Sequence, residues 1–237
     1  QERYMLTGSN QVQIPIARPE FHENDYEQLS TCLDSGWVGA GPKTEKFETL
    51  FAEYTQATGA IACSSGTTAL HLALRSAGID RGDEVLVPSF TWVASVNAIL
   101  YQGAIPKLCD IELDHYNLDV TKLDALVTPK TKAIMPVHLF GAAAPMKELN
   151  RWATSRGLSI IEDAACALGT WIDGRHAGLW GDFGTFSFHP RKLITTGEGG
   201  MCLARSVTKL AELKSLRNHG IDETGLINHF GYNDRLS

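Results

Sequence analysis

The most informative chemical residue in the sequence is a lysine in an unusual setting. Lys192 ends the segment SFHPRK (187–192), with aromatic residues before it and the glycine-rich segment TGEGG (196–200) after it. A lysine amine that is removed from water is a nucleophile that forms Schiff bases with carbonyl compounds. Most lysines are solvated surface residues instead, so this segment alone leaves both interpretations open.

A second segment, SGTT (65–68), predicts an anion site. It joins an expected strand to an expected helix, where free backbone N–H groups and the helix dipole favour a negative charge. Gly66 lets a phosphate approach the backbone closely, and the Thr67 hydroxyl can add a hydrogen bond. The alternative is that Ser65 only caps the helix.

Two further side chains follow expected strands. Asp163 comes after strand 158–162, and ligands of open parallel sheets bind beyond the carboxyl ends of the strands. A carboxylate there can hold a protonated ring nitrogen, or it can simply cap the next segment. Trp92 either stacks on a flat ring or packs in the core. We expect Glu162 to be a structural partner.

An alternation of strands and helices must position these residues. Expected strands cover 61–63, 84–87, 105–109, 133–137, 158–162, 183–188 and 200–204, and expected helices cover 67–77, 91–101, a segment capped by Asp119 that ends at 127, a segment opening near 145, and 207–218. This pattern predicts a three-layer α/β/α fold with a mostly parallel central sheet. We divide the chain into an N-terminal helical and loop segment, 1–58, and a large domain, 59–237.

Composition narrows the class of protein. The net charge is −6 and there is no long basic run, which argues against nucleic acid and anionic membranes as partners. The five cysteines lack the spacing of a disulfide framework or a zinc site, so we expect buried free thiols and no metal. The start of the chain does not resemble a signal peptide, and no apolar run is long enough to span a bilayer. These features predict a cytoplasmic protein.

In combination, the segments resemble the DegT/DnrJ/EryC1/StrS family of sugar aminotransferases, within the fold-type I pyridoxal 5'-phosphate (PLP) enzymes. The resemblance extends over essentially the whole chain. The matching segments, in order, are SGTT (65–68), PSFTW (88–92), VHLFG (137–141), EDAA (162–165), SFHPRK (187–192), TGEGG (196–200), LRNHG (216–220) and GYN (231–233).

The resemblance implies a reaction and the residues that carry it out. Lys192 would hold PLP as an internal aldimine and later carry the proton between the substrate carbon and the cofactor. Asp163 would keep the pyridine nitrogen protonated, and Trp92 would stack on the ring. The amino group, with glutamate as the expected donor, would pass to a keto group of a nucleotide-linked sugar.

The resemblance also implies a phosphate site shared between subunits. Gly66, Thr67 and Ser187 would hold the cofactor phosphate. Asn233 matches a position that reaches the phosphate from the neighbouring subunit, which implies a homodimer with a shared active site.

The sequence departs from the family pattern in three ways. Cys166 stands where Gln or His is usual, and Asp234 stands where an aromatic residue is common. Family members also continue into a small C-terminal domain, which we expect to be missing here. The alternatives are a non-catalytic or truncated PLP-binding module and a family member with dehydratase chemistry. Dehydratases of the family carry His at the position of Lys192, so this residue favours the aminotransferase.

Overall fold

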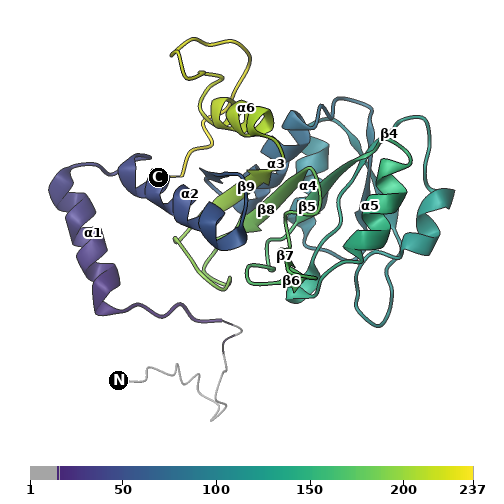
Figure 1. Ribbon diagram of the computed structural model, residues 1–237, viewed down its shortest axis with the longest axis horizontal. Helices are drawn as coiled ribbons and strands as arrows, with labels where there is room; N and C mark the ends of the chain where they lie inside the picture. The colour runs from purple at the N-terminus through teal and green to yellow at the C-terminus, as the bar shows by residue number, and fades with distance from the viewer. Residues whose placement is uncertain (1–14, 16, 237) are drawn as a thin grey trace, which may run out of the picture.

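A seven-stranded sheet forms the centre of the protein (Figure 1). The computed structural model describes residue 15 and residues 17–236. The strands lie in the order β1-β9-β8-β5-β4-β2-β3. Their bounds are β1 Ala60–Cys63, β2 Glu84–Pro88, β3 Ile105–Cys109, β4 Thr131–Ile134, β5 Ser159–Asp163, β8 Phe183–Ser187 and β9 Gly200–Ala204. The predicted mostly parallel sheet is confirmed, because only β9 runs antiparallel to its neighbours β1 and β8.

Helices cover both faces of this sheet, as the sequence predicts. The helices α3 (Gly66–Ser76), α4 (Val93–Tyr101) and α6 (Val207–Arg217) contribute to an apolar cluster with side chains such as Val85 and Val87 of β2. Leu86, between them, points to the opposite face and joins the cluster of α5 (Met146–Thr154). This two-residue alternation is the pleat of a strand buried on both faces.

Several element bounds differ from the prediction. Asp119 does cap a helix, accepting from Thr121 N at 2.9 Å, but the segment is the 3-10 helix η1 (Val120–Ala125). The strand expected at 133–137 ends at Ile134, since the ladder is replaced by an isolated bridge from Val137 to Asp163. A short hairpin, β6 (Trp171–Ile172) and β7 (Arg175–His176), and the 3-10 turn η2 (Leu139–Gly141) were not predicted.

The N-terminal part contains two helices with different environments. The helix α2 (Pro42–Thr55) buries Phe51, whose ring contacts Phe186 and Phe188 edge-on at centroid distances of 5.1 and 5.7 Å. The helix α1 (Glu23–Ser35) has no buried residue, and it stands away from the sheet at the left of Figure 1. The first fourteen residues of the expected segment 1–58 lie outside the described residues.

A largely buried ion pair connects α2 and α6 to β1. The Arg217 guanidinium donates to the Glu48 carboxylate and, at 2.5 Å, to the carbonyl of Ala62. The Ala62 N–H donates in turn to Glu48 at 2.8 Å. These bonds hold the strand that leads directly into the segment 65–68. No helix in the described part of the chain is long and apolar enough to cross a membrane.

Candidate active site

One cavity of about 480 Å³ lies at the edge of the sheet where parallel strands end. Its walls come from the segments that follow β1, β2, β4, β5 and β8. In an open α/β sheet this edge is the usual place for a ligand. Six of the seven residues predicted for the site line the cavity: Gly66, Thr67, Trp92, Asp163, Ser187 and Lys192.

The start of α3 forms the first wall. Ser65 caps the helix by accepting a hydrogen bond from Thr68 N at 3.1 Å. The N–H groups of Gly66 and Thr67 lie in the first turn, where the helix itself supplies no acceptor. A Cβ added to Gly66 would lie 2.8 Å from Cβ of Ser187. The two interpretations of this segment are therefore compatible, since Ser65 caps the helix and Gly66 lets the start of the helix lie close to Ser187.

Asp163 forms a buried, anchored part of the site. Its side chain is only 4% exposed, yet it lines the cavity. Oδ2 accepts a hydrogen bond from the hydroxyl of Ser95 at 2.7 Å, and Oδ1 accepts from Ala165 N at 3.2 Å. Sequence reasoning missed Ser95, because no local pattern indicates that the first turn of α4 lies against the end of β5.

Lys192 reaches into the cavity from the loop after β8. Its Nζ lies 3.1 Å from Sγ of Cys166. The cysteine that departs from the family pattern at position 166 therefore contacts the lysine. The expectation of buried thiols is wrong for Cys166, which is exposed, and for Cys32, which is half-buried. It is confirmed for Cys63, Cys109 and Cys202, and burial raises the pKa of the Cys63 and Cys109 thiols to about 12.

Exposed aromatic side chains line the cavity. Trp92 is the N-cap of α4 and is 70% exposed, which rules out the core-packing interpretation within this chain. Phe140 also lines the cavity, is 77% exposed, and has a left-handed φ of 54°. A positive φ in a bulky residue is a strained conformation that the surrounding structure must hold in place.

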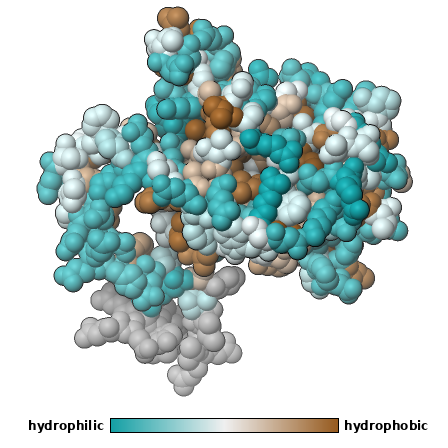
Figure 2. Space-filling view, in the orientation of Figure 1, coloured by the Kyte–Doolittle hydropathy of each residue, from teal (hydrophilic) through white to brown (hydrophobic). Residues whose placement is uncertain are grey.

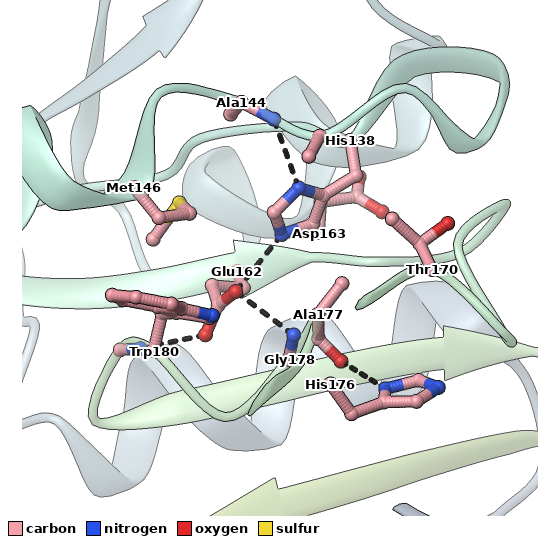
Figure 3. Close-up of polar contacts among 12 residues, drawn as sticks. His138, Ala144, Met146, Glu162, Asp163, Thr170, His176, Ala177, Gly178 and Trp180 are labelled. Carbon is pink, nitrogen blue, oxygen red and sulfur yellow. Dashed lines mark hydrogen bonds and ion pairs between the residues drawn. The ribbon is translucent and has the colours of Figure 1, made fainter. Parts of the chain in front are cut away.

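A buried polar network lies behind the site (Figure 3). The fully buried Glu162 carboxylate accepts from His138 Nε2 at 2.9 Å, Gly178 N at 2.8 Å and Gly181 N at 2.6 Å. His138 Nδ1 accepts from Ala144 N at 3.1 Å, so the ring proton is on Nε2. The predicted structural role of Glu162 is confirmed: it links β5 to the loop of His138 and to the loop after β7.

The groups lining this cavity match the functional groups of PLP. The lining includes an amine, an anchored carboxylate, and the start of a helix with hydroxyl groups beside it. A molecule with an aldehyde, a basic ring nitrogen, a phosphate and a flat ring has a complementary group for each of these. The residues present therefore fit the cofactor that the sequence predicts.

The pattern of the DegT/DnrJ/EryC1/StrS aminotransferase family matches residues 19–237. The chain belongs to this family. It is 45% identical to the GDP-perosamine synthase of Caulobacter vibrioides over 215 residues, which are 90% of this chain and 58% of that protein. The chain thus spans less than three fifths of the length of this relative.

Solved structures give the same assignment of fold. The aminotransferase from Psychrobacter cryohalolentis matches with a TM-score of 0.90 and 33% identity, over 92% of this chain and 59% of that one. NtdA from Bacillus subtilis, solved with bound cofactor PMP, matches with a TM-score of 0.85 and 31% identity, over 90% and 49% of the two chains. The fold-type I architecture predicted for this DegT/DnrJ/EryC1/StrS family member is confirmed.

The seventh predicted site residue of this family member lies elsewhere. Asn233 is exposed and does not line the cavity of its own chain. Its backbone forms an isolated bridge with Asn218.

Proposed function

We propose that this chain is the cofactor-binding part of a PLP-dependent aminotransferase that acts on a nucleotide-linked keto sugar. The observation that carries the proposal is the convergence of Lys192, Asp163 and the free N–H groups at the start of α3 on one cavity. PLP, when bound, supplies an electron sink for the amino-transfer reaction.

Each of these residues has a task that follows from its position. Lys192 Nζ holds the cofactor covalently and carries the proton to and from the substrate carbon. Asp163, anchored at both oxygens, keeps the ring nitrogen protonated by a charge-assisted hydrogen bond. Gly66, Thr67 and Ser187 bind the phosphate, and the exposed face of Trp92 is available to the ring.

The relatives suggest the substrate class. The chain is 41–45% identical to three GDP-perosamine synthases, which favours a GDP-linked sugar as the acceptor. We propose glutamate as the amino donor. The lysine at position 192 supports amino transfer over dehydration.

We also propose that 59–237 forms the PLP-binding domain after an N-terminal segment, 1–58. Because the cysteines are free thiols, a reducing cytoplasmic location is consistent with this function.

We further propose a homodimer with a shared active site. Three large apolar side chains that line the cavity are exposed, namely Phe90, Trp92 and Phe140, and so are Leu193 and Ile194, which follow Lys192 in the chain. Leu226, Ile227 and Phe230 are exposed on the loop after α6, which projects at the top of Figure 1, and hydrophobic atoms lie at the tip of this loop in Figure 2. Exposed apolar surface of this extent is typical of an interface.

The absorption spectrum of the purified protein with PLP tests the cofactor and the reaction. We expect a visible band that requires Lys192, is absent in Lys192→Ala, and gives way to the pyridoxamine form on addition of glutamate. A band that requires Lys192 but ignores glutamate would indicate another donor or a binding module. The absence of any band in the wild-type protein would contradict the proposal.

Mixing two inactive variants tests the shared site. A Lys192→Ala chain and an Asn233→Ala chain, unfolded together and refolded at equal concentration, should form heterodimers with one intact site. Random pairing then restores roughly a quarter of the wild-type sites, because half of the dimers are mixed and each has one intact site of two. If Asn233 acts within its own chain, mixing restores nothing.

A further inference from the structure

The hydroxyl of Ser95 connects α4 to the carboxylate of Asp163. Ser95 is fully buried, and its Oγ lies 2.7 Å from Oδ2 of Asp163. The same Oγ lies 2.9 Å from Oγ1 of Thr91, a residue that lines the cavity. Three polar groups thus form a continuous chain from the cavity wall to the carboxylate.

The donors in this chain can be assigned from the chemistry of the groups. An ionised carboxylate only accepts hydrogen bonds, so Ser95 must donate its single proton to Asp163. Ser95 then has only lone pairs for its other neighbour, and Thr91 must donate to it. The direction of the chain is therefore Thr91 to Ser95 to Asp163, and each hydroxyl strengthens the one that follows it.

We infer that Ser95 is a positioning residue that holds the Asp163 carboxyl group in the orientation required to bind the cofactor ring nitrogen. This inference rests on the proposed function. With Oδ2 bound to Ser95 and Oδ1 bound to Ala165 N–H, the carboxyl group cannot rotate without losing a hydrogen bond. At 4% exposure, little water is available to replace these bonds.

Ser95→Ala removes one of the two anchors and leaves Oδ2 without a donor. The unsolvated oxygen then competes with the ring nitrogen for the shared proton. We expect PLP affinity to fall about tenfold, in line with the loss of one hydrogen bond to a charged group. We also expect the ¹⁵N resonance of ring-labelled PLP to move toward that of the unprotonated pyridine.

The chain offers a matched control for this substitution. Ser76 is a buried serine of the neighbouring helix α3, and among the described residues its Oγ has no hydrogen-bond partner. Ser76→Ala removes the same atom from the same kind of environment, so it should leave PLP affinity and the ¹⁵N resonance unchanged. Ser95→Thr keeps the hydroxyl and should restore both toward wild-type values.

A crystal structure of Ser95→Ala without cofactor provides a second measurement that does not depend on PLP. We expect the Asp163 carboxyl group to have rotated away from its position in the wild-type protein. If affinity, ¹⁵N resonance and carboxyl orientation all match those of Ser76→Ala, Ser95 has no positioning role. If the wild-type protein binds no PLP at all, the proposed function fails and the inference fails with it.

Discussion

Replacing Glu162 by glutamine tests how much the network behind the site contributes to the stability of the fold. The carboxylate presents two acceptor oxygens to three N–H donors, those of His138, Gly178 and Gly181. Glutamine has nearly the same shape but replaces one oxygen with an NH₂ group. Wherever that NH₂ group lies, it faces at least one donor that then has no acceptor.

The contacts set the size of the effect. The better placement keeps the amide oxygen at the Oε2 position, where it serves His138 and Gly178, and abandons Gly181 N. One buried donor left unpaired costs about 1–3 kcal/mol, and two charge-assisted bonds become neutral ones. Relief from burying a charge offsets part of this loss. We therefore expect the free energy of unfolding to fall by about 3 kcal/mol.

His138 cannot compensate for this change by moving its proton. Its Nδ1 already accepts from Ala144 N, so a proton at Nδ1 would break that bond. Glu162 holds two loops, the one that begins at His138 and the one that ends at Gly181. The first of these loops carries the strained Phe140. The substitution should therefore loosen the wall of the cavity as well as the fold.

Urea unfolding followed by circular dichroism measures the change in free energy. For a chain of this size, about 3 kcal/mol corresponds to a fall of about 6–12 °C in the melting temperature. Glu53→Gln is the control, because Glu53 lies on an exposed part of α2 and its carboxylate has no ion pair among the described residues. Its effect should stay within about 0.5 kcal/mol. Equal stability of the two variants would refute the assigned role of Glu162.

Three further substitutions or treatments test other parts of the molecule. Gly66→Ala places a methyl group 2.8 Å from Cβ of Ser187, so PLP affinity measured by titration should fall at least about tenfold. The control Gly39→Ala, with open space around the new methyl group, should leave PLP affinity unchanged. Iodoacetamide should alkylate the exposed Cys166 before the buried thiols, and PLP should protect it; mass spectrometry of peptides would show otherwise if a buried thiol reacted first. Burial raises the pKa of Asp234, so its ionisation opposes folding once the pH exceeds the pKa of this carboxyl group in the unfolded chain. Asp234→Asn should therefore stabilise the protein at pH 8, by at most about 1 kcal/mol, and leave its stability at pH 3 unchanged. A gain in stability at both pH values would point to another cause.

Local sequence patterns predicted most of the strands and helices, because the signals for each element lie within a few neighbouring residues. Strands such as β3 and β9 have the predicted bounds, and the cap of α3 lies at Ser65 as expected. The same rule explains the errors. The segment after Asp119 is a 3-10 helix, and the strand before Val137 ends early, because packing against other elements decides these bounds.

The site residues divide in the same way. Glycine at a strand-to-helix junction and an acidic residue after a strand are local signals, and both led to residues that line the cavity. The contact between Ser95 and Asp163 spans 68 residues, and the contact between Lys192 and Cys166 spans 26. Such pairs have no local signature, because they depend on which strands become neighbours in the sheet.

The reversed direction of β9 shows how sheet order builds the proposed anion site. Because β9 runs antiparallel between β1 and β8, its first residue, Gly200, pairs with both Cys63 and Ser187. A Cβ on Gly200 would lie 2.3 Å from the carbonyl oxygen of Ser65, so only glycine allows this approach. The segments 65–68 and 187–192 are thereby brought together at one edge. The glycine-rich segment after Lys192 thus also serves the proposed phosphate site, since it reverses the chain into β9 at Gly200.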